Sequence, residues 1–163
     1  MTTSYRDQIA TDLDRLRDAG QKEYAQEAEN AHANFERIAD ALDLEPATVL
    51  LTYAYKHIDG IRAWRDGHTS QREPVTGRLN DLMVYMALLY GMQCGARTRA
   101  SVAKVLDGLV KLVPEGGSFD LFEAWGDLLA SEYSGSYNQL AVRCVFNAAF
   151  LVRVSLLQEE ETE

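Results

Sequence analysis

The chain of 163 residues has little cysteine and little proline, and it lacks any sustained alternation of apolar and polar residues. Its two cysteines, Cys94 and Cys144, lie far apart and outside any metal-ligand spacing, which excludes a disulfide framework and a zinc knuckle. The missing alternation leaves no pattern for a β-sheet, whereas apolar residues recur at helical spacing almost throughout. These absences favour an all-α protein.

Positive charge is also scarce, because 16 Lys and Arg face 25 Asp and Glu and give a formal net charge of -9. Phosphate binding on duplex nucleic acid is driven by Lys and Arg, so we expect no duplex partner. Part of the excess negative charge lies in the acidic run at 159–163. We interpret this run as a solvated, frayed tail that follows a single domain at 1–158. The protein could still bind a small anionic ligand if its arginines cluster at one place.

No apolar signal region follows Met1, and the most apolar stretch, Leu140 to Leu157, is interrupted by Arg143, Asn147 and Arg153. We therefore expect a cytoplasmic protein without a membrane partner.

The helical periodicity predicts one all-α domain, a bundle of six to seven helices with short connections. Gly20 is expected to end the first helix, and Pro46 and Pro74 are expected at the first positions of the third and fourth. Pro114 follows the fifth helix, and Asp120 is a candidate cap for the sixth. The predicted helices occupy residues 5–20, 21–42, 46–66, 74–93, 102–113, 122–133 and 137–158.

The predicted helices at 74–93 and 137–158 are apolar on most faces, more than a chain of this size usually buries. We therefore expect a homodimer or a larger homo-oligomer. Arg143 and Asn147, one turn apart on the last helix, either complete a site across the bundle or specify a dimer register.

Ionisable side chains between Lys56 and Tyr90 interrupt what otherwise reads as buried helix, and this is the strongest indication of a site. Arg78, Asp81 and Tyr85 share one helical stripe, which continues through apolar residues. A polar end and an apolar end on one face suit the phosphate and base of a nucleotide. The alternative is an ordinary intrahelical ion pair between Arg78 and Asp81.

Arginines also gather around the loop that joins the third and fourth predicted helices. They could clamp phosphates with bidentate hydrogen bonds, or they could form a solvated face paired with neighbouring acids. The arginines are Arg62, Arg65, Arg72 and Arg78, and the acids are Asp59, Asp66 and Glu73.

Metal ligands are harder to find in the sequence. His57 lies on an apolar helix face, which is more typical of a core histidine than of a ligand, and His32 and His68 add no ligand spacing. We therefore predict no transition-metal site. A magnesium site needs only one or two carboxylates plus substrate phosphates, so Asp81 stays a candidate ligand. Its companion would be Glu73, Glu36 or Asp59.

Three segments form a pattern in this order: Asn34-Phe35 with Ile38-Ala39, then Lys56-His57, then Glu73-Pro74 with Arg78, Asp81 and Tyr85. They resemble a group of small helical bacteriophage proteins, distantly similar to the nucleotide pyrophosphohydrolases of the MazG type. Those proteins have an Asn-Phe-x-x-Ile-Ala helix, a lysine-bearing helix and an Asp-x-x-x-Tyr helix. The resemblance covers residues 22–92 and implies a phage or prophage origin and a link to nucleotides. MazG-type enzymes hold magnesium with Glu-x-x-Glu and Glu-x-x-Asp pairs, but here Arg78 stands three positions before Asp81.

The sequence therefore predicts a protein that binds a phosphorylated nucleotide between its second, third and fourth helices, for sequestration or for nucleotide metabolism. Lys56, Arg72 and Arg78 would meet phosphate. Asp81 and Asn34 would orient the sugar or base, and Tyr85 or Trp64 would stack on the base. No catalytic residue is predicted. Two alternatives stay open: a non-enzymatic protein, such as a phage-encoded inhibitor, that docks on a host protein, and a magnesium-dependent nucleotide pyrophosphohydrolase.

Overall fold

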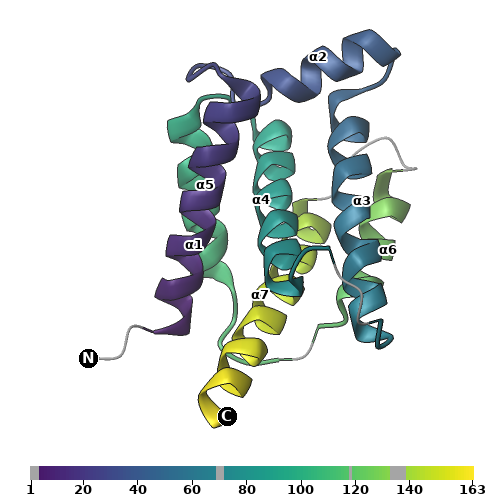
Figure 1. The fold of residues 1–163 in the computed structure, drawn as a ribbon. Helices are drawn as coiled ribbons and strands as arrows, with labels where there is room; N and C mark the ends of the chain where they lie inside the picture. The colour runs from purple at the N-terminus through teal and green to yellow at the C-terminus, as the bar shows by residue number, and fades with distance from the viewer. Residues whose placement is uncertain (1–3, 69–71, 118, 133–138) are drawn as a thin grey trace.

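A computed structural model describes residues 4–68, 72–117, 119–132 and 139–163, and these residues form an all-α bundle (Figure 1). The prediction of a single all-α domain is confirmed, and the described residues contain no β-strand. A π-helical turn, η1 (Gln21–Ala25), extends the first helix. The α-helices are α1 (Tyr5–Gly20), α2 (Ala33–Leu42), α3 (Pro46–Arg65), α4 (Val75–Cys94), α5 (Arg99–Leu112), α6 (Leu121–Glu132) and α7 (Gln139–Thr162).

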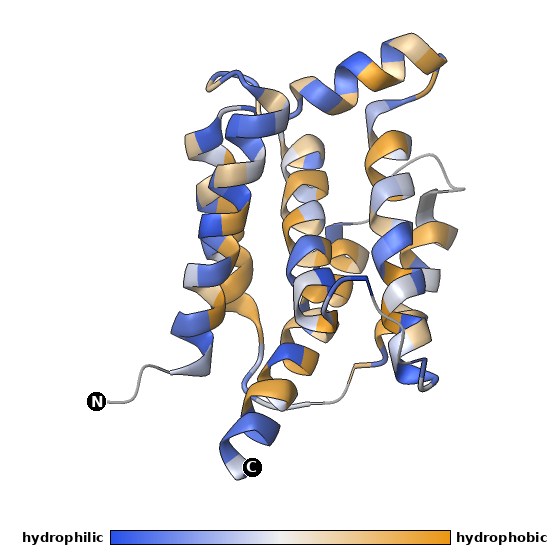
Figure 2. Ribbon diagram, in the orientation of Figure 1, coloured by the Kyte–Doolittle hydropathy of each residue, from blue (hydrophilic) through white to orange (hydrophobic). Residues whose placement is uncertain are grey.

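Helix α4 forms the centre of the bundle, where it packs against α1, α3, α5 and α7. In Figure 1 it stands between α1 and α3, and α2 lies across their upper ends. Figure 2 shows its apolar residues within the bundle. The fully buried residues of α4 are Leu79, Leu82, Met83, Met86, Ala87 and Leu89. Of the two apolar helices that suggested an oligomer, α4 is therefore largely covered within one chain, and oligomerisation stays a prediction.

The first α-helix ends at Gly20, as predicted, but the glycine does not break the helical path of the chain. Gly20 keeps right-handed helical geometry, with φ −64° and ψ −40°, and the chain continues into η1. Gln26, with φ 66°, ends that turn, and its N–H donates to the carbonyl of Gln21 at 2.8 Å. Such an i to i+5 bond inserts an extra residue into the turn, which side-chain periodicity does not reveal.

The second helix begins at Ala33, twelve positions later than predicted near Gln21. The segment between η1 and α2 makes backbone hydrogen bonds to the chain at the start of α5. Ala31 donates its N–H to the carbonyl of Arg97 at 2.6 Å, and Arg99 donates its N–H to the carbonyl of Ala28 at 2.9 Å. The apolar spacing of Ala28 and Ala31 therefore reflects loop packing, because long-range bonds satisfy the backbone there.

The starts of α4 and α6 agree closely with the expected signals. Pro74 is the N-cap of α4, one position before the predicted place, and Val75 is the first helical residue. Asp120 caps α6, since its Oδ1 accepts from the N–H groups of Phe122 and Glu123 at 2.9 and 3.2 Å. The predicted helix ends at residues 133 and 137 lie outside the described residues.

Helix α7 is long and apolar enough to cross a membrane by length and composition, and half of its most apolar 18-residue stretch is buried in the fold. It packs mainly against α4 and α6. The helix continues to Thr162, so most of the acidic run expected to fray is exposed helix, and the Tyr5 hydroxyl donates to Glu161.

The buried charge on α7 has partners inside the bundle. The side chain of Arg153 is 5% exposed, and its guanidinium donates to Asn80 Oδ1 at 3.0 Å and pairs with Asp12 Oδ2 at 3.4 Å. These contacts join α7 to α4 and α1. A buried cation without such partners would be strongly unfavourable.

Replacing Arg153 by Ala should lower the free energy of unfolding by about 3 kcal/mol, because Asn80 and Asp12 lose their partner and the stem leaves a cavity. Urea denaturation measures this change. Arg15→Ala, on the exposed face of α1, is the control and should change stability by less than about 0.5 kcal/mol. Equal effects of the two substitutions would contradict this role for Arg153.

Candidate functional site

A cavity of about 700 Å³ lies where the end of α1 and η1 face α2, α3 and α4. A smaller lobe of about 120 Å³ adjoins it. We call the larger space the outer lobe and the smaller one the inner lobe. Residues of the outer lobe alone include Glu23, Arg37, Tyr53, Lys56, His57 and Glu73. Residues of the inner lobe alone are Arg17, Gln21, Ala25, Ala31, Val84 and Leu88. Both lobes share Leu16, Gly20, Tyr24, Asn34, Phe35, Asp81 and Tyr85.

Three aromatic rings from three helices form one wall of the cavity. Phe35 of α2 meets Tyr53 of α3 and Tyr85 of α4 edge to face, with ring centroids 6.4 and 6.2 Å apart. The rings of Tyr53 and Tyr85 lie nearly parallel, at 14° and 6.5 Å. Phe35 is buried, Tyr85 is half-buried and Tyr53 is exposed. Such a wall offers a flat, apolar surface to an aromatic ligand.

An ionisable cluster lies beside this wall. It contains His57 of α3, Glu73 just before α4, and Asp81 of α4, and one ligand atom from each lies within 4.8 Å of the other two. His57 Nε2 is 3.6 Å from Asp81 Oδ2, which is too long for a hydrogen bond. Lys56 Nζ lies 3.8 Å from Glu73 Oε1 at the exposed edge. We call His57, Glu73 and Asp81 the acidic cluster.

Burial decides the charge of these groups. Desolvation lowers the pKa of His57 to about 4, so its imidazole is neutral at pH 7 and the contact with Asp81 is not an ion pair. Desolvation, with the nearby charge of Glu73, raises the pKa of Asp81 to about 6. Desolvation, with the charge of Asp81, also raises the pKa of Tyr85 to about 12, so this phenol keeps its proton.

A neutral imidazole and two carboxylates form a ligand set for a divalent cation. Three protein ligands leave coordination positions open for water or for phosphate oxygens. His57 is 6% exposed, and its Nε2 is the ring nitrogen that faces Asp81. Of the companions considered for Asp81, Glu73 lies in the cluster. Glu36 instead pairs with Arg97 at 3.0 Å, and Asp59 lies 3.4 Å from Arg62.

Four of the six predicted ligand-binding residues line the cavity: Lys56, Asp81, Tyr85 and Asn34. Arg72 is exposed and lines neither lobe. Trp64, predicted as an alternative stacking residue, is 37% exposed and also lines neither lobe.

Arg78 is buried in the interface between α3 and α4 instead of lining the cavity. A Cβ atom at Gly60 would lie 2.3 Å from Arg78 Nη1, so the glycine makes room for the guanidinium. The alternative of an intrahelical ion pair between Arg78 and Asp81 is not seen in the described residues, and Arg78 lines neither lobe of the cavity. The charge of Arg78 still opposes the desolvation that raises the pKa of Asp81, and it adds to the desolvation that lowers the pKa of His57.

The arginines of the loop region divide between surface and interface. Arg62 and Arg65 lie over the ring of Phe122, at 5.1 and 4.2 Å from its centroid. Arg65 also pairs with Asp66 at 3.1 Å. These two side chains agree with the solvated-face alternative. None of the four candidate clamp residues, Arg62, Arg65, Arg72 and Arg78, lines either lobe of the cavity.

Several cavity residues were absent from the predicted site. Gln21 and Arg17 could not be placed, because the π-helical turn that positions Gln21 has no sequence signature. His57 was assigned to the core from its own helix face, and only the packing of α3 against α4 brings it to Asp81. Arg143 and Asn147 line neither lobe, so they do not complete this site.

No protein-family model, curated protein or solved structure matches the chain. The resemblance to phage proteins therefore stays a prediction from the sequence.

The acidic cluster should cost stability when no cation is bound. Asp81 has a folded pKa near 6 against an ordinary value of 3.8, so its ionisation destabilises the fold as pH rises through 6. In a chelating buffer at pH 8, Asp81→Asn should raise the free energy of unfolding. The side chain is 34% exposed, so solvent screening limits the gain to about 1 kcal/mol.

This gain should disappear near pH 3, below the ordinary pKa of 3.8, where Asp81 is mostly protonated in both the folded and the unfolded state, and urea denaturation at the two pH values measures it. Asp59→Asn, whose side chain is 63% exposed and lines neither lobe, is the control and should change the free energy of unfolding at pH 8 by less than about 0.5 kcal/mol. A less stable Asp81→Asn protein at pH 8 would contradict the assigned electrostatics.

Proposed function

We propose that the protein binds a phosphorylated nucleotide together with a divalent cation in the two-lobed cavity. The main support for this proposal is that one cavity contains both the aromatic wall and the acidic cluster. The aromatic wall lies next to the acidic cluster, and both are accessible from the outer lobe. A nucleotide combines the two corresponding groups, a flat base and an anionic phosphate chain.

The charge of the outer lobe explains why a cation is needed. Glu23, Glu73 and Asp81 line it against Arg37 and Lys56, so acids exceed bases and a bare phosphate chain would be repelled. A divalent cation on the acidic cluster reverses the local charge. It also supplies coordination positions that phosphate oxygens fill. Lys56 then contacts the outer phosphates as a flexible point charge.

The base occupies the aromatic side of the cavity in this proposal. Tyr85 is half-buried and shared by both lobes, which makes it the stacking residue, and Asn34 offers an amide to the sugar or the base edge. Stacking on an aromatic side chain contributes about 1–3 kcal/mol per base. The apolar residues beyond it, Val84 and Leu88, exclude water from the base.

Hydrolysis of the nucleotide is a second candidate function, favoured by the same acidic cluster. A cation held beside the phosphates would polarise a phosphorus–oxygen bond and could orient a water molecule for attack. Sequestration and pyrophosphohydrolysis use the same ligand set, so analysis of the products separates them. The released product would be pyrophosphate or orthophosphate, with the corresponding shorter nucleotide.

Isothermal titration calorimetry with the ribonucleoside and deoxyribonucleoside triphosphates should show binding in Mg²⁺. In excess chelator the affinity should fall at least about tenfold, because the acidic outer lobe then repels the phosphates. Chromatography of the same mixtures detects any hydrolysis. The proposal fails if mono-, di- and triphosphates all show no binding with Mg²⁺ or Mn²⁺.

Two substitutions should affect opposite ends of the ligand. Glu73→Gln removes a cation ligand and should weaken binding of both magnesium nucleotide and magnesium pyrophosphate, by about tenfold. Tyr85→Leu keeps an apolar side chain but loses stacking, so it should weaken nucleotide binding about tenfold and leave pyrophosphate binding unchanged.

Glu36→Gln and Tyr55→Leu are matched controls, because neither residue lines the outer or the inner lobe. Neither control should change binding beyond experimental error. A loss of pyrophosphate binding in a folded Tyr85→Leu protein would contradict the assignment of the two ends.

A further inference from the structure

The acidic cluster differs from an ordinary group of surface carboxylates because it contains a buried histidine. His57 is 6% exposed and lines the outer lobe, and neither of its ring nitrogens has a hydrogen-bond partner among the described residues. Nδ1 is enclosed by protein, whereas Nε2 faces Asp81 at 3.6 Å, beyond hydrogen-bond distance. Buried polar groups are normally paired, so Nε2 is a ligand atom that lacks its partner.

The three ligand atoms of the acidic cluster are spaced for one ion. At metal–ligand bonds of about 2.1 Å, two ligand atoms on the same ion lie between about 3 and about 4.2 Å apart. The distance of 3.6 Å from His57 Nε2 to Asp81 Oδ2 is within this range. One ligand atom from each of His57, Glu73 and Asp81 lies within 4.8 Å of the other two. The side chain of Glu73 is 42% exposed, so it can move the short remaining distance.

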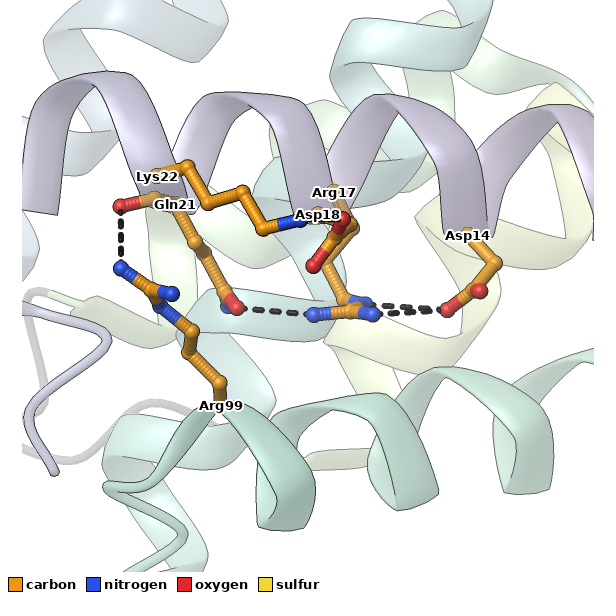
Figure 3. Close-up of polar contacts among 6 residues, drawn as sticks. All are labelled: Asp14, Arg17, Asp18, Gln21, Lys22 and Arg99. Atoms are coloured by element: carbon orange, nitrogen blue, oxygen red, sulfur yellow. Dashed lines mark hydrogen bonds and ion pairs between the residues drawn. The ribbon is translucent and has the colours of Figure 1, made fainter. Parts of the chain in front are cut away.

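The inner lobe does not offer a second place for the ion, because its charged side chain is itself a cation. Arg17 is 6% exposed, and its guanidinium donates to Asp14 Oδ1 and to Gln21 Oε1, both at 2.8 Å (Figure 3). Asp14 is therefore already paired. The carboxylate that lines the inner lobe is that of Asp81, which both lobes share. A bound ion thus lies on the side of Asp81 that faces His57.

A nitrogen ligand changes which ion the cluster prefers. Mg²⁺ is a hard cation that takes oxygen ligands, and carboxylates bind it as they bind Mn²⁺. Imidazole suits the first-row transition ions, whose affinities for such sites rise from Mn²⁺ through Fe²⁺ to Co²⁺. His57 is therefore the member of the cluster that distinguishes the two classes of ion.

We propose that His57 makes the acidic cluster selective for a divalent first-row transition ion over Mg²⁺. This inference deepens the proposed function and rests on it, because it names the class of cation that holds the nucleotide phosphates. It departs from the expectation drawn from the sequence, in which no second histidine stood at ligand spacing. The companions of His57 come instead from α4 and from the residue before its N-cap, and the imidazole packs 5.8 Å from the ring of Tyr85.

Calorimetry on the metal-free protein, without nucleotide and at neutral pH, compares CoCl₂ with MgCl₂. An oxygen-only site also prefers Co²⁺ to some degree, so a variant of His57 decides the test. His57→Gln places an amide of similar reach where Nε2 stands, and its oxygen is a hard ligand. It should weaken Co²⁺ binding at least about tenfold and change Mg²⁺ binding less than about threefold. Unchanged Co²⁺ binding, or an equal loss of both ions, overturns the inference.

Two further variants show that the effect belongs to the nitrogen ligand. Glu73→Gln removes an oxygen ligand and should weaken Co²⁺ and Mg²⁺ alike. His68→Asn is the matched control, since His68 is exposed and lines neither lobe, and it should keep both wild-type affinities. Circular dichroism and thermal melting check the fold of each variant. A loss of Co²⁺ binding in folded His68→Asn equal to that in His57→Gln contradicts the assignment.

A proton spectrum of the wild-type protein with Co²⁺ decides the matter if His57→Gln does not fold. An imidazole that binds Co²⁺ through Nε2 carries its proton on Nδ1, and the paramagnetic ion shifts this N–H resonance far outside the usual range. Nδ1 of His57 is enclosed by protein, so its proton exchanges slowly with water and stays visible. One such resonance should appear and should persist in His68→Asn. Its absence overturns the inference.

The outcomes separate this inference from the proposed function. If nucleotides bind with Mg²⁺ but His57→Gln loses both ions equally, the proposed function stands and the role of His57 is wrong. If Co²⁺ binds through His57 but no nucleotide binds with any of these ions, the proposed function fails and the ion selectivity stands. If no ion binds to the wild type, with or without nucleotide, both fail.

Discussion

The burial of α4 at the centre of the bundle is the constraint on which the rest of the structure depends. Its apolar residues pack against four other helices, so the few polar side chains on it have fixed places. Asp81 and Tyr85 face the cavity, Asn80 meets Arg153, and Arg78 fills the space above Gly60. These four polar residues of α4 thus have separate places in the fold.

The cavity combines a stable wall with an electrostatically unfavourable end. The aromatic rings come from three helices that pack together, so the apolar surface is preformed. The acidic cluster instead desolvates two carboxylates near each other, which raises the pKa of Asp81. Arrangements of this kind persist where a ligand offsets their cost. A divalent cation would do so, and phosphates would complete its coordination.

The fold class was predictable from helical periodicity, because an apolar stripe leaves a clear pattern on each helix. The π-turn was not, since an extra residue in one turn changes no composition, and Gln21 was therefore read as the start of a helix. In the site, the stripe through Asp81 and Tyr85 was found because both lie on one helix. The sequence placed His57 in the core and Arg78 at the ligand. Their actual surroundings depend on how α3 packs against α4, which periodicity on a single helix does not predict.

Paramagnetic broadening by Mn²⁺ tests the central claim most directly, because the three histidines lie in different parts of the fold. Imidazole proton resonances, assigned by substitution, are followed while Mn²⁺ is added at substoichiometric amounts with a nucleoside triphosphate. We expect strong broadening of the His57 resonances and of the nucleotide phosphorus signals, with little effect on His32. Broadening that spares His57, or that affects all three histidines equally, would contradict a cation site shared by the acidic cluster and the nucleotide.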